Sequence, residues 1–192
     1  MRSTAYVIEL IIAGVGSLAW MALIVFSIFG YEWLPVDLVF KAGFVIIISP
    51  FIYVVGVVTD RLVDNLFDRR FKENPDNPDF LEKEAYIRAR TKIYLASDNL
   101  RDLLEYGKMR IRICRAWAFN SFFLMILGTV FVFTLSEVAL GLRTGIAGLV
   151  FIFFGLSTLL SFRAWKMLSI KEAEFLRIQG EILEELLQEK KG

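Results

Sequence analysis

The chain has 192 residues, of which 56% are apolar, and its formal net charge is only +1. It contains no histidine and a single cysteine, Cys114, which excludes histidine-dependent zinc chemistry, Ser-His-Asp catalysis and any intramolecular disulfide. The sequence also has no Gly-x-x-x-x-Gly-Lys phosphate loop and no Gly-x-Gly-x-x-Gly dinucleotide motif. We therefore expect neither an enzyme nor a bound cofactor or metal.

Four apolar stretches are close to the roughly 20 residues that a helix needs to cross a hydrocarbon core about 30 Å thick. They run from Ala5 to Phe29, Leu38 to Thr59, Ala116 to Leu135 and Gly145 to Phe162. The pattern predicts an all-α integral membrane protein with four transmembrane helices. Residues 1–59 would hold spans one and two and residues 116–162 spans three and four, while residues 60–115 and the tail 163–192 would form a cytosolic helical extension.

Basic residues predict the orientation. All Lys and Arg residues except Arg2, Lys41 and Arg143 lie between spans two and three or after span four. Because Lys and Arg accumulate on the cytoplasmic side, both termini are expected there. The first stretch is too long for a typical signal peptide and is expected to be retained. The predicted location is a plasma membrane, or the inner membrane of a bacterium.

Small residues gather in the first span, where they would let a neighbouring helix approach closely: Ala13, Gly14, Gly16 and Ser17. Three polar residues lie near the predicted span ends, namely Glu9, Lys41 and Asn120. We expect each to reach the interface or to make a capping hydrogen bond.

The second span is predicted to continue as a helix beyond Thr59, because Val63, Leu66 and Phe67 keep a helical spacing. Two prolines and several Asn and Asp residues in 72–79 predict a loop that ends it. From Phe80 to Ile113 the pattern indicates helix, either continuous or broken near Ser97, that leads into the third span.

Basic residues line one face of this predicted helix at i, i+7, i+11 and i+14, with a fifth close by: Arg101, Lys108, Arg112 and Arg115, and Arg110. Two interpretations are open. The row either anchors the helix at lipid phosphates, or it binds an anionic ligand and forms the wall of a cytosolic vestibule that controls gating.

Polar residues make the third span the first candidate to line a water path: Asn120, Ser121, Thr129 and Thr134. Glycines follow one side of the fourth span and predict a close helix contact, within the chain or, as the alternative, with another subunit: Gly141, Gly145, Gly148 and Gly155. The tail carries an apolar stripe that another helix of the chain or a neighbouring subunit should cover: Phe175, Ile178, Ile182, Leu183 and Leu186.

Four helices enclose too little polar surface for one chain to conduct, so a pore would require several copies. In size and topology the chain resembles small multispan effectors of prokaryotic defence systems, in which a cytosolic signal opens an oligomeric pore and depolarises the cell. This resemblance implies a homo-oligomeric ion channel gated from its cytosolic helical region. The alternative is a non-conducting membrane anchor that recruits a cytosolic partner. Expected partners are the lipid bilayer, further copies, and an anionic ligand or a cytosolic protein; nothing indicates a nucleic acid.

Overall fold

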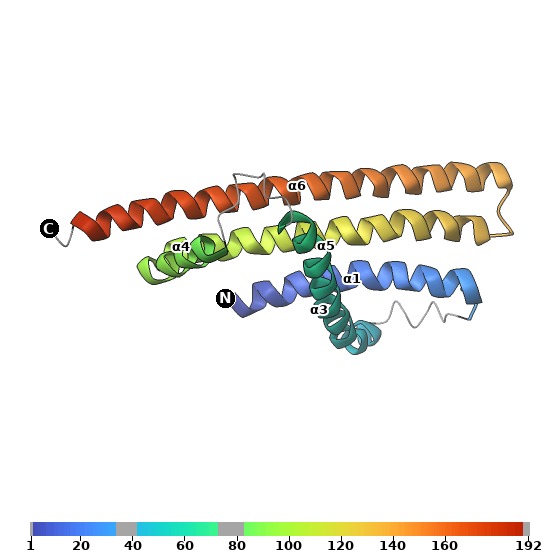
Figure 1. The fold of residues 1–192 in the computed structure, drawn as a ribbon. Helices are drawn as coiled ribbons and strands as arrows, with labels where there is room; N and C mark the ends of the chain where they lie inside the picture. Colours follow the sequence, from blue (N-terminus) through green and yellow to red (C-terminus); the bar gives the residue numbers. More distant parts are fainter. Residues whose placement is uncertain (1, 34–41, 73–82, 190–192) are drawn as a thin grey trace.

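The computed structural model describes residues 2–33, 42–72 and 83–189, and this part is helical with no strand. The helices are α1 (Arg2–Phe29), α3 (Ala42–Lys72), α4 (Lys83–Ala96), α5 (Asp98–Thr134) and α6 (Leu140–Glu189) (Figure 1). All but α4 contain a segment that is long and apolar enough to cross a membrane. The predicted all-α fold with four such helices is confirmed, and it is the pattern of a multi-pass membrane protein.

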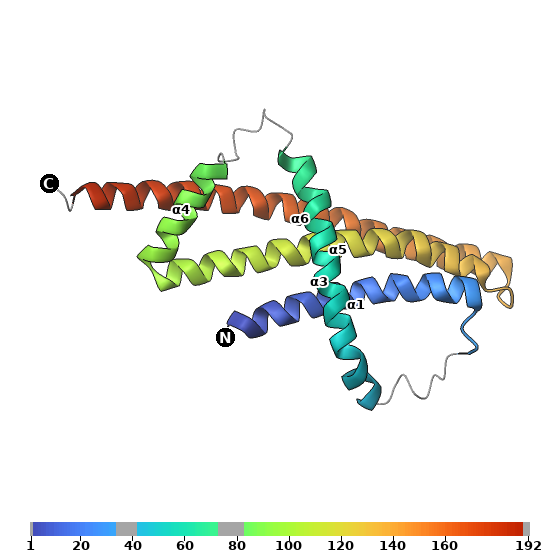
Figure 2. The same ribbon diagram turned by 60° about the horizontal axis from the view of Figure 1, so that its bottom comes forward.

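Three of the four long helices lie side by side, and the fourth crosses them. Helix α5 lies between α1 and α6 and packs along both. In Figures 1 and 2, α1, α5 and α6 run nearly parallel, whereas α3 crosses them steeply in both views. The start of α1 and the end of α6 lie toward the same end of this three-helix layer (Figure 1).

Glycine brings α1 and α3 into backbone contact where they cross. A methyl group on Gly14 would overlap the carbonyl oxygen of Ile52, and one on Gly56 would overlap that of Leu10. Any larger side chain would therefore push the two helices apart. The close approach predicted for the small residues of the first span is confirmed, and its partners are α3 at Gly14 and Asn120 of α5 at Gly16.

Side chains of α1, α3 and α5 meet around these glycines, and we call this region the α3 crossing. It comprises Glu9, Leu10, Ala13, Gly14, Ser17, Trp20, Ile52, Gly56, Thr59, Asp60, Asp64, Arg112, Arg115 and Asn120. Beyond it, the C-terminal part of α3 reaches α6, where the ring of Phe67 lies edge-on to that of Trp165 with centroids 4.9 Å apart.

Ser97 separates α4 from α5. Its backbone is extended, with φ −158° and ψ 131°, so the chain changes direction there and α4 packs against both α5 and α6. Of the two arrangements expected for this segment, the structure shows two helices that meet at Ser97. A small core lies where α4, α5 and α6 meet, and it is formed by Ile93, Leu104 and Leu176, which are all buried.

The tail of α6 is covered from within the chain, but only in part through the predicted stripe: Phe175 packs against the core of Ile93, Leu104 and Leu176. Ile178 and Ile182 of the predicted stripe are each 42% exposed, whereas Leu176 is fully buried. Small residues explain the difference: Gly180 lets Ala89 of α4 approach to contact distance, and a helix packs most closely where its neighbour has no bulky side chain.

Helix α3 ends at Lys72, where the predicted loop begins. The rest of that loop and Lys41 lie outside the described residues, as do the side chains of Leu183 and Leu186.

Candidate functional site

The predicted basic row divides into two parts in the structure. Arg112 and Arg115 reach carboxylates of α1 and α3, whereas Arg101 and Lys108 lie beside an aromatic ring of α4. Arg110 belongs to neither part: it is exposed, and its guanidinium carbon lies 5.7 Å from the centre of the Tyr106 ring. One helix face therefore holds two different electrostatic environments.

Arg115 is the centre of the first part. It is only 5% exposed, its Nη2 donates to Oδ1 of Asp60 over 3.2 Å, and its Nη1 forms an ion pair with Asp64. Asp60 is itself buried, while Asp64 is partly exposed. A buried charge is tolerated only when it is paired, so this guanidinium ties α5 to α3.

Glu9 extends the buried charges to α1. Its Oε1 lies 3.7 Å from Nη1 of Arg112, and Glu9 is only 4% exposed. The Glu9 carboxylate lies inside the helix contact, and its Oε1 has no hydrogen-bond partner in the described part of the chain. Its position at a membrane interface stays a prediction. Arg112 of the basic row supplies a countercharge, which lowers the free-energy cost of burying the Glu9 carboxylate.

Asn120 joins the same three helices by uncharged contacts. It is fully buried, its Nδ2 donates to the Ala13 carbonyl over 2.9 Å, and Trp20 Nε1 donates to its Oδ1 over 3.2 Å. Ser17 Oγ lies 3.0 Å from the same Oδ1 and 2.8 Å from Thr59 Oγ1. In this single chain the Asn120 side chain thus holds helices together rather than capping its own helix, and an interfacial position for it stays a prediction.

The other candidates for a water path are also engaged within the chain. The hydroxyls of Ser121 and Ser157 lie 3.0 Å apart between α5 and α6. Thr129 and Thr134 each donate to a backbone carbonyl of their own helix, those of Met125 and Phe131. Each of these hydroxyls thus has a partner in the single chain, and the prediction that Asn120, Ser121, Thr129 and Thr134 line a water path stays a prediction.

The space beside most glycines of the fourth predicted span is empty in the described part of the chain. Nothing in the described part of the chain lies within 4 Å of a methyl group placed on Gly141, Gly145 or Gly148, whereas one on Gly155 would lie 3.4 Å from Met125 Sδ. The expected contact within the chain is found at Gly155 alone. The apolar part of α6 is the least covered of the four, with 6% of its most apolar stretch buried against 39% for α5.

The second part of the basic row surrounds Tyr94 of α4. The side-chain charges of Arg90, Arg101 and Lys108 lie 5.2, 5.3 and 5.8 Å from the centre of its ring. We call these four residues the Tyr94 cluster. Arg101 Nε and Lys108 Nζ are shielded from solvent and have no hydrogen-bond partner among the described residues.

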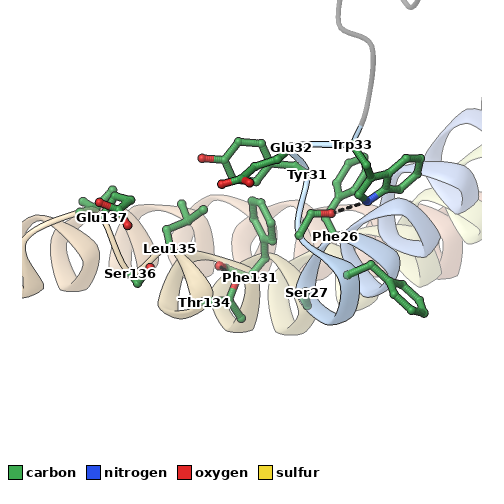
Figure 3. Close-up of a pocket in the computed structure, with 13 residues that line it drawn as sticks. Phe26, Ser27, Tyr31, Glu32, Trp33, Phe131, Thr134, Leu135, Ser136 and Glu137 are labelled. Atoms are coloured by element: carbon green, nitrogen blue, oxygen red, sulfur yellow. Dashed lines mark hydrogen bonds between the residues drawn. The ribbon is translucent and has the colours of Figure 1, made fainter.

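A pocket of about 530 Å³ lies at the opposite end of the layer, between the end of α1 and the turn from α5 to α6. Figure 3 shows its lining of aromatic rings, among them Phe26, Trp33 and Phe131, with the carboxylates of Glu32 and Glu137 at its edges. Trp33 donates to the Gly30 carbonyl over 2.7 Å. None of the predicted ligand residues lines this pocket, and of the predicted water-path residues only Thr134 does.

Several residues of the two sites were not singled out in the sequence. Asp60 and Asp64 follow the second apolar stretch at i and i+4, so they share one helix face where a basic partner would be needed. Arg90 and Tyr94 have the same spacing in α4. Among the described residues, no group of three or more Cys, Asp or Glu side chains is placed to hold a metal ion.

Comparison with known proteins gives no match: no protein-family model, curated protein or solved structure is similar to this chain.

Proposed function

We propose that the protein is a homo-oligomeric ion channel whose gate is controlled from its cytosolic helical region. The observation that supports this best is the α3 crossing, where a buried guanidinium on α5 holds a long apolar helix across its neighbours through Asp60 and Asp64. Such an arrangement can have two states, because the ion pair stabilises α3 in one position and its loss removes the main polar restraint on that position.

Several copies are needed because four helices enclose too little polar surface for one chain to conduct. The exposed apolar face of α6 and the open glycines Gly141, Gly145 and Gly148 are suited to contact with a second copy. In the channel, a cytosolic signal would weaken the pairing of Arg115, α3 would turn toward the direction of the other helices, and polar side chains of the α3 crossing would become available to water. An open pore would depolarise the membrane, as in the defence effectors that the chain resembles in topology.

The test is ion flux from liposomes that contain the purified full-length protein. Asp60→Asn removes the ion pair between Arg115 and Asp60, and Arg115→Gln removes the pairs of Arg115 with both Asp60 and Asp64. Lys171→Gln removes an exposed charge of α6 as a matched control. We expect the first two variants to raise flux severalfold over the wild type, and the control to equal the wild type. If all four proteins are silent across the accessible range of voltage and salt, the channel proposal is rejected.

A second candidate is a membrane anchor that recruits a cytosolic protein and conducts nothing. The internal hydrogen bonds of Asn120 and Ser121 favour it, because a resting chain whose polar groups are satisfied has none left to line a pore. This candidate predicts a monomer without flux in every variant. A size measurement on the same preparations separates it from the channel, which must contain several copies.

A further inference from the structure

We propose that the Tyr94 cluster binds a phosphate-type oxyanion. The geometry brings together three cations from two helices around a single ring, with their charged atoms 5.2 to 5.8 Å from its centre. By these distances no two of the charges lie more than about 11 Å apart. That separation is close to one Debye length at physiological salt, so the three cations repel one another.

The ring does not offset this repulsion. A cation held over an aromatic face gains about 0.5–1 kcal/mol at an exposed site and about 2 kcal/mol where it is desolvated. A neutral ring carries no countercharge, however, and here one ring serves three cations. Tyr94 also accepts a contact from Arg90 Nη2 at 3.4 Å, at the outer limit of a hydrogen bond. Two charges of the opposite sign act on Lys108, those of Glu172 and Glu105. Glu172 accepts a hydrogen bond from the Tyr86 hydroxyl over 3.2 Å, and neither carboxylate accepts one from Lys108 Nζ.

The donors point to the ligand class. Arg101 Nε and Lys108 Nζ are shielded from solvent, yet nothing in the described part of the chain accepts a hydrogen bond from either. A buried cationic donor without an acceptor is costly. A phosphate group offers several acceptor oxygens and negative charge, and guanidinium groups match its geometry. One bound phosphate would satisfy Arg101 and Lys108 together and would relieve their mutual repulsion.

The phosphate can come from either of two sources. Lys108 precedes the predicted start of the third span at Ala116 by eight residues, which is about 12 Å along a helix. A lipid headgroup and a soluble phosphate compound are both within reach of such a position, and they share the same chemistry.

The experiment measures binding directly on the full-length protein in a zwitterionic detergent. Isothermal titration with inorganic pyrophosphate tests the soluble source. Native mass spectrometry with phosphatidic acid, compared with phosphatidylcholine, tests the lipid source. The variants are Lys108→Met and Arg101→Gln, and the matched controls Lys171→Met and Arg177→Gln remove the same charges from exposed positions of α6.

We expect the wild type to bind one of the two probes. The cluster variants should bind that probe at least roughly tenfold more weakly, because each loses a charge-assisted hydrogen bond, and the controls should stay within about twofold. Pyrophosphate binding assigns a soluble ligand, and selective binding of phosphatidic acid assigns a lipid. Equal losses of binding in the cluster variants and in the control variants would show general charge attraction and would overturn the site. A wild type that binds neither probe would overturn it as well.

Thermal unfolding without any anion separates binding from folding. Lys108→Met removes a buried donor that lacks an acceptor, so the variant should unfold at the same temperature as the wild type or higher. A fall of several degrees would mean that Lys108 has a structural role, and the proposal would be abandoned. A role of this site in gating rests on the proposed channel function, whereas binding does not. Binding without flux would keep the site and reject the channel, and flux without binding would do the reverse.

Discussion

The α3 crossing and the Tyr94 cluster use basic residues of the same helix face in opposite ways. At the α3 crossing, Arg115 is buried against Asp60 and Asp64 and ties α5 to α3. At the Tyr94 cluster, Lys108 lies seven residues earlier on α5, in a place where its ammonium group has no acceptor among the described residues. The difference teaches that spacing on a helix predicts which residues share a face, while the neighbouring helices decide what each charge does.

The largest expected effect is a loss of unfolding free energy when the ion pairs of the α3 crossing are removed. Arg115→Gln leaves the buried carboxylate of Asp60 without its countercharge, and such a loss costs about 3–5 kcal/mol of unfolding free energy. Unfolding in detergent micelles measures it, with Lys171→Gln as a control near zero. The double variant Asp60→Asn/Arg115→Gln should recover part of the loss, because neither group is then charged. If the double variant is as unstable as the two single losses added together, the two residues are not coupled.

The next effect tests the backbone contact at the same crossing. Gly56→Ala places a methyl group against the Leu10 carbonyl, and overpacking of this kind costs about 1–3 kcal/mol. Gly148→Ala is the matched control, since its methyl group meets nothing within 4 Å in the described part of the chain. We expect the control to be neutral in a monomer and to weaken self-association if α6 contacts a second copy. Equal unfolding free energies for Gly56→Ala and wild type would contradict the steep crossing.

A smaller effect concerns the uncharged part of the crossing. Asn120→Leu leaves the Trp20 and Ala13 groups without their partner, at a cost of about 1–2 kcal/mol. Thr134→Val serves as the control, because the Thr134 hydroxyl bonds only its own helix and is exposed. The same unfolding assay gives both values. A neutral Asn120→Leu would mean that this side chain faces elsewhere.

The smallest effect should have the opposite sign. Lys108→Met in anion-free buffer is expected to leave the unfolding free energy unchanged or to raise it by up to about 1 kcal/mol, because a buried donor without an acceptor is removed. Lys171→Met should do neither. A clear loss of unfolding free energy in Lys108→Met would contradict the contrast between the α3 crossing and the Tyr94 cluster.

The sequence predicted the elements of the fold better than their arrangement. Apolar length alone predicts four long helices, and Gly14 predicts a close contact. A break at Ser97 was one of two arrangements that the sequence left open, because its side chain competes for backbone hydrogen bonds. The steep path of α3 was not predictable, because the exposed apolar stretch of this helix would suit an aligned span equally well.

The candidate site was predictable only in part. The basic row was recognised, but the pairing of Arg112 with Glu9 joins residues more than a hundred positions apart, and no local pattern connects them. The tail of α6 shows the converse limit. Its large apolar residues suggested one buried face, which is covered only in part, while the small residue Gly180 places Leu176 against α4.

One unbroken helix carries the chain from the α5–α6 turn almost to its end. With 50 residues, α6 is about 75 Å long, far more than the roughly 30 Å of a hydrocarbon core. A small tilt of α6 at its tail, where α4 packs against it, therefore displaces the opposite end of the helix. The displacement grows with the distance along the helix between the two ends. A ligand that shifts α4 by little would thus change the angle at which the apolar half of α6 meets its surroundings.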